Sequence, residues 1–359
     1  MNKIAELISR LCPDGVEFKT LDSLVSYVQP GPYIVSSTEY DAHYSTPVLT
    51  AGQSFILGYT NEEEGIYNAS SQKPVIIFDD FTTSFHWVDF DFKVKSSALK
   101  ILKMKDKQEA DFRYIYMAMK TIHFIPTNHI RHWISLYSKF EIPLPPLNIQ
   151  KEIVSILDSF TSLIDKMKQE EEMRKKQMEY YLNILICKDN VAARLFGDIG
   201  VVQRGKRVVR KELALQGCIP VFQNSLTPLG YYQYSNIPAN NTFIISAGTA
   251  GEIGFSAKPF WAADDCLVIS SVLCDSKYLY YYLKTQEQFL KSQIRGGAMK
   301  RLSRETIEKL EIPVPSLEKQ RQIVSILDTF ETYISKLEKM IELRQKQYEY
   351  YREKLLTFE

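Results

Sequence analysis

A 46-residue segment that occurs twice constrains this chain more than any other feature. Residues 141–186 and 311–356 align without a gap and are identical at 23 of the 46 positions. Each copy opens with a Pro-x-Pro sequence and continues for about 38 residues without glycine or proline, which favours one long helix. A globular stretch precedes each copy. The repeat therefore predicts two domains, each attached to a long helix.

Apolar residues in both long segments recur at three- and four-residue steps, the spacing that places them on one face of a helix. We predict that the two helices pack against each other through these faces as a coiled coil. At 1.5 Å per residue, each helix would span roughly 57 Å. The candidate packing residues are Ile153, Ile156, Phe160, Leu163, Met167 and Tyr181 in the first helix, and Ile323, Ile326, Phe330, Tyr333, Leu337 and Tyr351 in the second.

The globular stretches also look like diverged copies of one another. Residues 27–31 correspond to residues 201–205, and Asp111 with its following tyrosines corresponds to Asp275 with its own. Short β-type runs, and one helix-like segment late in each stretch, predict an α+β tandem duplication with two similar α/β domains. We expect a first domain at residues 1–147, a central helix at 148–187, a second domain at 188–317 and a C-terminal helix at 318–359.

Composition narrows the class of protein. A chain with 45% hydrophobic and 24% charged residues is typical of globular proteins, and the absence of a long apolar run predicts a cytoplasmic protein without a membrane span. Five cysteines without a CxxC pair argue against a zinc module or a disulfide framework. Residues 1–147 carry a net charge of −3 and residues 188–317 a net charge of +5. The second domain is therefore the better candidate for a surface that faces a polyanion.

Three groups of residues point to other chemistry, but each lacks an essential part. Asp80, Asp91 and Lys93 are residue types that a magnesium-dependent nuclease uses, yet the second copy has no counterpart. The glycine-rich residues 248–254 lack the Lys-Ser/Thr pair of a phosphate-binding loop. No acidic residue or cysteine stands at a fixed spacing to complete a metal site with His123, His129 and His132. We therefore predict no catalytic residue and no metal ligand.

Basic and polar loops remain as candidate nucleic-acid contacts. Lysine and arginine hold phosphates, and arginine also reads base edges through paired hydrogen bonds. A solvated charged face is the alternative interpretation of any one of these loops. The candidate DNA-binding residues are Arg204, Lys206, Arg207, Arg210, Lys211, Arg295, Lys300, Arg301 and Arg304 in the second domain, and Thr82, Thr83, Ser84, Lys93 and Arg131 in the first.

Specific motifs accompany the repeat. After two intervening residues, Gln150 and Gln320 are each followed by Ile-Val-Ser-Ile-Leu-Asp-x-Phe. Residues 78–82 read Phe-Asp-Asp-Phe-Thr, and residues 251–254 read Gly-Glu-Ile-Gly. With these motifs in a domain and helix order that repeats over essentially the full chain, the sequence resembles the specificity subunit of a type I restriction-modification enzyme.

This resemblance implies a non-catalytic DNA-recognition subunit. Each target-recognition domain would read one half of a bipartite, asymmetric site in double-stranded DNA, and the helices would set the spacer between the halves. A pseudo-twofold relation between the copies would make the helices antiparallel, with half-sites about 34 Å apart on one face of the DNA. The base-reading residues of this family vary with the DNA sequence, so the candidate contacts above rest on the residues alone.

The resemblance also implies partners. Methyltransferase subunits would dock on the helices and domains and bind S-adenosylmethionine. Restriction subunits would use ATP and magnesium. This chain would hold no cofactor of its own.

Two other functions stay open at this point. A coiled-coil scaffold for protein partners would show no sequence preference on DNA and no salt-dependent DNA binding. A nuclease using Asp80, Asp91 and Lys93 would cut DNA by itself in the presence of magnesium.

Overall fold

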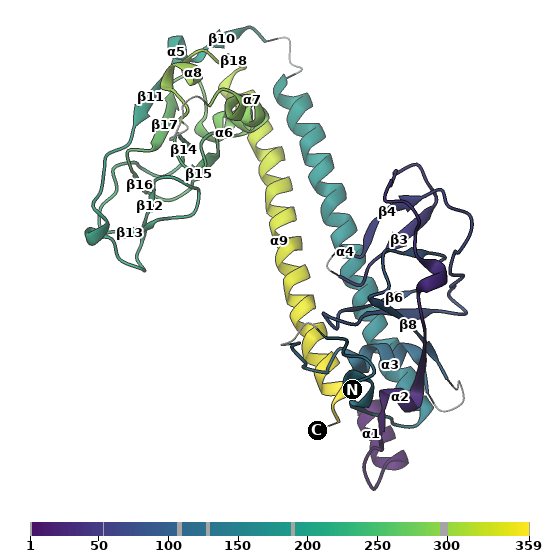
Figure 1. Ribbon diagram of the computed structural model, residues 1–359. Helices are drawn as coiled ribbons and strands as arrows, with labels where there is room; N and C mark the ends of the chain where they lie inside the picture. The colour runs from purple at the N-terminus through teal and green to yellow at the C-terminus, as the bar shows by residue number, and fades with distance from the viewer. Residues whose placement is uncertain are drawn as a thin grey trace. The chain divides into compact units, whose positions relative to one another are not determined.

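The computed structural model describes residues 2–52, 54–105, 110–126, 130–187, 191–294 and 301–358 (Figure 1). Its contacts divide the chain into two units, residues 1–166 with 341–359 and residues 167–340. Each unit contains one mixed α/β domain and a part of both long helices, α4 (Leu147–Cys187) and α9 (Leu317–Leu356).

The first unit is built on a four-stranded antiparallel sheet in the order β2-β8-β5-β6. A smaller sheet has the order β4-β3-β7, in which β3 pairs antiparallel with β4 and parallel with β7. Strands β1 and β9 form a third pair that joins the beginning and the end of the domain. The elements are α1 (Asn2–Leu11), β1 (Phe18–Thr20), α2 (Leu21–Leu24), β2 (Val25–Val28), η1 (Gly31–Tyr33), β3 (Thr46–Leu49), β4 (Ile56–Thr60), β5 (Val75–Asp79), β6 (Phe85–Val88), β7 (Lys93–Val94), β8 (Leu99–Met104), α3 (Phe112–Met119), η2 (Tyr137–Lys139) and β9 (Glu141–Pro143).

The second unit repeats this topology. Its sheets have the orders β11-β17-β14-β15 and β13-β12-β16, and β10 pairs with β18. Again the middle strand of the smaller sheet pairs antiparallel on one side and parallel on the other. The elements are β10 (Ala193–Leu195), α5 (Phe196–Ile199), β11 (Gly200–Arg204), η3 (Arg210–Glu212), β12 (Ile219–Phe222), β13 (Gly230–Tyr232), β14 (Asn241–Ile245), β15 (Ile253–Ser256), β16 (Trp261–Ala262), β17 (Cys266–Ser271), α6 (Ser276–Thr285), α7 (Glu287–Ser292), α8 (Arg304–Glu308) and β18 (Glu311–Pro313). The duplication therefore extends to the fold of both domains.

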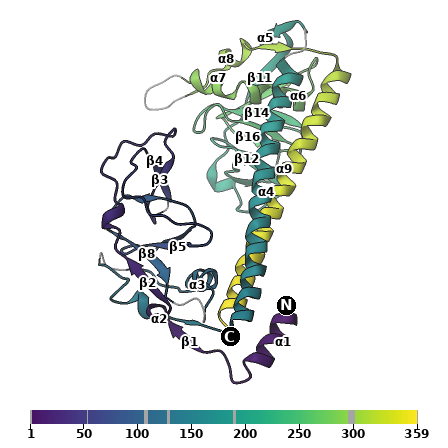
Figure 2. The same cartoon turned by 90° about the vertical axis from the view of Figure 1, so that its right-hand side faces the viewer.

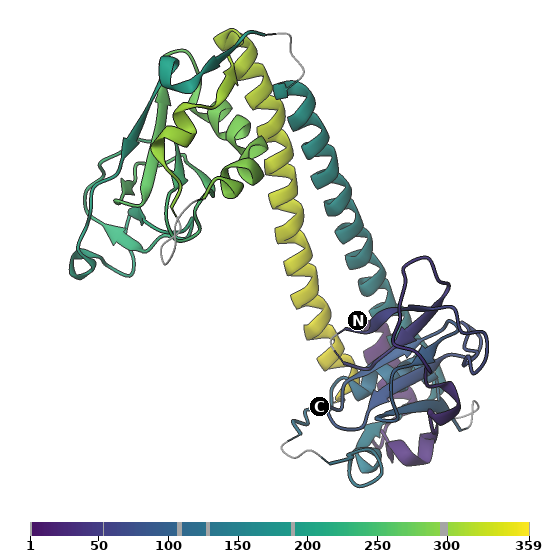
Figure 3. The same cartoon turned by 45° about the horizontal axis from the view of Figure 1, so that its top comes forward.

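One helix of each domain lies between the main sheet and a long helix. In the first unit, α3 packs with the sheet on one side and with α4 on the other (Figure 2). In the second unit, α6 occupies the same place between its sheet and α9 (Figure 3). An aspartate caps each of these helices, because Asp111 accepts two backbone N–H bonds at the start of α3 and Asp275 does the same for α6. The two apolar cores thus include the first turns of the long helices.

The long helices lie side by side and antiparallel, as predicted. Within the first unit, the ring of Phe160 on α4 lies 5.5 Å from that of Tyr351 on α9. Within the second unit, Tyr181 on α4 stacks on Phe330 of α9 at 5.5 Å. Later residues of α4 thus meet earlier residues of α9, which confirms the antiparallel helix pair.

The buried face of these helices differs in part from the predicted one. Ile153, Ile323 and Leu337 are buried, and Ile156 and Met167 are half-buried. Leu163 and Ile326 are 41% and 43% exposed, which corrects the prediction for both. Tyr333 is also 43% exposed, although its hydroxyl donates to Glu170 across the pair at 2.7 Å. The positions buried in their place are Leu157, Ile164, Leu327 and Ile334.

The physical reason for this shift is that each helix packs on its own domain as well as on its partner. Leu157 belongs to the core of the first domain and Leu327 to the core of the second. No helix within the described ranges is both long and apolar enough to cross a lipid bilayer.

Candidate nucleic-acid interface

In the second unit, two basic segments that are far apart in the sequence meet at one turn. The turn, residues 263–265, connects β16 to β17. Arg204, at the end of β11, donates from Nε to the carbonyl oxygen of Asp264 at 2.7 Å. Arg301 approaches the same turn, with its Nη2 3.4 Å from Oδ1 of Asp265. The fold thus brings together Arg204 and Arg301, which sequence reasoning had placed in separate loops.

The loop after β11 is held by its backbone. Gly205 donates its N–H to the carbonyl oxygen of Cys266 at 2.9 Å, and a Cβ at this glycine would clash with the carbonyl oxygen of Ala263. Lys206 donates its N–H to Ala262 at 2.8 Å and accepts a bond from the indole of Trp261 at 2.7 Å. These contacts anchor the main chain. The side chains of Lys206, Arg207 and Lys211 remain exposed, without a carboxylate partner in the described part of the chain.

An aromatic cluster lies under the same loop and was missed as a candidate site. Trp261, Tyr232 and Tyr234 pack edge to face, with ring centroids 5.1 Å and 5.7 Å apart, and Tyr234 is 60% exposed. An exposed tyrosine hydroxyl next to exposed cations suits contact with the phosphates of nucleic acid. The signal that would have found these rings is the run Tyr231-Tyr232-Gln233-Tyr234, although only the strand pairing shows which loop it approaches.

The other predicted contacts of the second domain are less well defined. Arg304 forms an ion pair with Glu308 at 2.6 Å, one turn further along α8. Arg295 and Lys300 lie outside the described residues, as does the side chain of Arg210.

In the first unit, the β5–β6 turn and the segment around Arg131 meet at Asp80. Asp80 accepts from His132 N with its carbonyl oxygen and from Trp133 N with its carboxylate, both at 2.8 Å. Asp79 shapes the turn by accepting from the N–H groups of Phe81 and Thr82. The exposed Arg131 and Thr82 are therefore anchored through neighbouring residues at one place.

The two remaining residues of this turn are less accessible. The Thr83 side chain is buried, and its φ of +58° is strained for a β-branched residue. Ser84 is half-buried, with its hydroxyl 2.5 Å from that of Thr82. Thr83 is thus withdrawn from the surface that Thr82 and Arg131 present.

Corresponding backbone contacts show that Arg131 and Arg301 occupy equivalent positions. In the first unit, His132 N donates to the carbonyl oxygen of Asp80, and in the second, Leu302 N donates to that of Ser246 at 2.9 Å. Each arginine precedes the donating residue. Both domains therefore present an exposed arginine at the same place in the fold.

Lys93 is a correction to the predicted DNA contacts. Its side chain is 3% exposed, and its ammonium lies 2.8 Å from the Glu62 carboxylate and 2.6 Å from the carbonyl oxygen of Glu64. The bond from Lys93 is the main reason that the pKa of Glu62 lies below its usual value. The Lys93 side chain therefore bonds to Glu62 and Glu64 inside the domain and does not face solvent.

The residues of the nuclease alternative have separate partners. The Asp80 carboxylate lies 3.5 Å from the buried ammonium of Lys100. Asp91 accepts from Asn68 at 3.1 Å, and Lys93 pairs with Glu62. Across the residues that the structure describes, no three His, Cys, Asp or Glu side chains gather as a metal site would require, and His129 lies outside those residues.

Two mixed α/β domains of the same topology, each with an exposed arginine beside a turn and each packed on a helix of an antiparallel pair, define a tandem nucleic-acid-binding protein. Comparison with known proteins identifies the family. The model of the type I restriction modification DNA specificity domain matches residues 13–173 and again residues 189–345. This chain belongs to that family, and as a specificity subunit it recognises DNA sequence and is not itself an enzyme.

Relatives match over nearly the whole length. The EcoR124I/EcoR124II specificity subunit of Escherichia coli is 36% identical, with 96% of this chain and 95% of the relative covered. A putative type I restriction enzyme specificity subunit of Haemophilus influenzae is 28% identical, with 96% of each covered. The crystal structure of the S subunit from M. genitalium matches the fold with a TM-score of 0.71 at 18% identity, covering 95% of this chain and 96% of that one.

Proposed function

We propose that the two domains of this specificity subunit read the two halves of a bipartite, asymmetric DNA site. The observation that carries the proposal is the shared topology with different side chains at the same surface. Around Arg131 the first domain presents Thr82 and Ser84, whereas around Arg301 the second presents a basic loop. One fold with two different surfaces suits two different short sequences.

The proposed contacts divide by chemistry. Arg131, Arg204 and Arg301 would read base edges, since a guanidinium can make paired bonds to a guanine. The other exposed basic side chains and small hydroxyl side chains would bind phosphates and fix the position of the domain on the duplex. The phosphate-binding set is Lys206, Arg207, Lys211, Thr82 and Ser84.

The long helices would bind the methyltransferase subunits. Large apolar side chains are exposed at equivalent positions of the two helices. Met173 and Tyr180 on α4 are 62% and 61% exposed, and their counterparts Leu343 and Tyr350 on α9 are 56% and 58% exposed. Such repeated apolar positions suit two copies of one partner.

Cofactors and location follow from this assignment. S-adenosylmethionine would belong to the methyltransferase, and ATP and magnesium to a restriction subunit. The complex would work in the cytoplasm, where its substrate DNA lies.

Methylome sequencing tests the proposal. The chain is expressed with its cognate methyltransferase, and methylated bases are mapped across the host genome. We expect one motif with two specified halves and an unspecified spacer. Exchange of residues 1–147 for the corresponding domain of another family member should then change one half only. A contiguous motif, or a change in both halves, would contradict the proposal.

A further inference from the structure

In addition to its apolar core, each domain is attached to its long helix by two polar contacts, and the first is made by a buried glutamine. The Gln150 side chain on α4 accepts from Asp111 N and donates to the carbonyl oxygen of Pro145, both at 2.7 Å. Gln320 on α9 makes the same two bonds, to Asp275 N at 2.7 Å and to Pro315 at 2.9 Å. Both glutamines are completely buried. They fix the start of each long helix against the cap of the domain helix.

The second point is a cation that links the domain to a carboxylate of the long helix. In the first unit, Arg113 of α3 donates from Nε and Nη2 to Asp158 of α4 at 3.1 and 2.8 Å. Its guanidinium lies 4.9 Å from the Trp87 ring and 5.2 Å from the Tyr116 ring. We call Arg113, Asp158, Trp87 and Tyr116 the first clasp.

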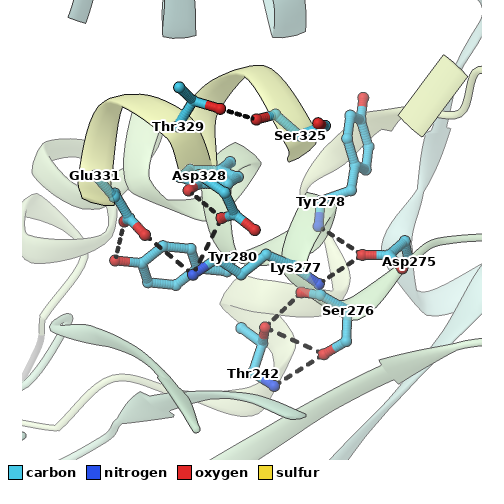
Figure 4. A network of polar contacts seen from close by, with 11 residues as sticks. Thr242, Asp275, Ser276, Lys277, Tyr278, Tyr280, Ser325, Asp328, Thr329 and Glu331 are labelled. Carbon is cyan, nitrogen blue, oxygen red and sulfur yellow. Dashed lines mark hydrogen bonds and ion pairs between the residues drawn. The ribbon is translucent and has the colours of Figure 1, made fainter. Parts of the chain in front are cut away.

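The second unit has the same arrangement with different residues. The ammonium of Lys277 on α6 lies 3.4 Å from Asp328 and 3.0 Å from Glu331, both on α9 (Figure 4). It also lies 4.4 Å from the Phe255 ring and 4.8 Å from the Tyr280 ring. We call these five residues the second clasp.

Tyrosine hydroxyls complete the second clasp. Tyr280 donates to Glu331 at 3.1 Å, and the adjacent Tyr281 donates to Asp328 at 2.6 Å. Burial, together with these carboxylates, raises the pKa of both tyrosines, so both remain neutral donors. Both carboxylates that pair with Lys277 are therefore also bonded to tyrosines of α6.

The two points are separated along the helix axis by the same distance in both units. Asp158 follows Gln150 by eight residues, and Asp328 follows Gln320 by eight. Eight residues correspond to about 12 Å along a helix. The apolar cores attach each domain to its helix, and a single polar contact would leave the domain free to tilt slightly within that packing. A second polar contact about 12 Å away restrains this tilt. The clasps therefore hold the tilt of each domain on its helix.

A role in folding alone does not explain the clasps well. The charged groups are partly exposed, with 28% and 40% of the Arg113 and Asp158 side chains accessible, and such ion pairs contribute little to stability. The apolar cores hold the domains on the helices without them. The two copies have also kept the geometry while the chemistry changed from arginine to lysine and from tryptophan to phenylalanine.

We propose that the clasps are positioning residues that set the spacer length this protein accepts between its two half-sites. This inference rests on the proposed reading of a bipartite site. A spacer changed by one base pair displaces a half-site by about 3.4 Å along the DNA. A domain held at a fixed tilt cannot follow that displacement, whereas a domain released from its clasp can.

The experiment uses the full chain with its cognate methyltransferase and plasmids whose half-sites are separated by the native spacer or by one base pair more or less. Wild type should methylate the native spacing. Lys277→Met keeps an aliphatic chain against Phe255 and Tyr280 but removes the charge. We expect its methylation of the altered spacings, relative to the native one, to rise about fivefold, the ratio that a partly exposed ion pair supports. The bases read in each half should not change.

The control is Lys284→Met. Lys284 lies on the same helix but pairs within the domain, with Glu287 at 2.9 Å, so spacer selection should stay unchanged. Lys277→Arg should retain wild-type selection. If Lys277→Met folds poorly, Asp328→Asn weakens the clasp without changing its shape and should relax spacer selection in the same way.

Three results would overturn the inference. The first is a Lys277→Met complex that melts like wild type and still methylates only the native spacing. The second is a Lys284→Met complex that loses spacer selection. The third is a change in the bases that the Lys277→Met complex reads. A wild-type complex without any bipartite motif would instead refute the proposed function itself, and the inference with it.

Discussion

At the scale of single residues, the clearest difference between the two domains, within the residues that the structure describes, is a buried ion pair in the first. Asp80 and Lys100 are each 1% exposed. Strand pairing places Ser246 and Leu267 at the equivalent positions of the second domain, where Ser246 bonds to Asp265 and Leu267 lies in the apolar core. The fold therefore tolerates either a charged pair or a neutral one.

Lys100→Leu should destabilise the chain by about 3–5 kcal/mol, because Asp80 would remain buried without its cation. The double variant Asp80→Ser/Lys100→Leu, which carries the residues of the second domain, should lose less than the single variant, because no buried charge is left and only the bond from Trp133 N to the Asp80 carboxylate is lost. Urea unfolding of the full chain measures both. Lys95→Leu, at an exposed lysine that follows β7, is the control and should have little effect. Equal losses for the single and the double variant would contradict this account.

A pH dependence follows from Glu62. Because its pKa is lowered in the folded state, chiefly by Lys93, its contribution to stability is present above the usual pKa of 4.5 and is lost as the pH falls below it. Glu62→Gln should therefore reduce the free energy of unfolding more at pH 7 than at pH 3.5. Thermal melts at both values measure the difference.

At the scale of elements, two leucines of α4 distinguish whether the burial of a side chain or its place in the helical repeat predicts the stability lost on its removal. Leu157→Ala should cost about 2–5 kcal/mol, because this side chain is completely buried. Leu163→Ala should cost less than about 1 kcal/mol, because that leucine, one of the predicted packing residues, is 41% exposed. Chemical denaturation of the two variants compares the same substitution in the same helix. A larger loss for Leu163→Ala would mean that the buried face is wrong.

At the scale of the whole molecule, the duplication predicts that equivalent arginines act on different halves of the DNA site. Arg131→Ala should weaken discrimination in one half and Arg301→Ala in the other, each by about 1–3 kcal/mol. Binding of the complex to duplexes with base changes in one half measures this. Lys206→Ala should instead weaken binding to all sequences and reduce the salt slope by about one. Loss of both halves from a single arginine substitution would argue against independent domains.

Much of this molecule is readable from its sequence. The repeat, the helix pair and the family depend on the order and spacing of residues along the chain, so they can be recognised without knowledge of the tertiary contacts. Gln150 and Gln320, and the aspartates eight residues after each of them, can also be recognised from the sequence, because the motif that contains them is repeated.

Only the tertiary structure decided which charged side chains face solvent and which distant segments meet. Lys93 was predicted to contact DNA, yet strand β7 carries it into the interior beside Glu62, because the partner of a lysine is chosen by strand pairing and not by its neighbours in sequence. Arg204 and Arg301 became one site because β11 and β17 are adjacent strands and the turn before β17 approaches both arginines. Spacing along a chain encodes local helices and repeats, whereas proximity between remote residues exists only after the sheet has formed.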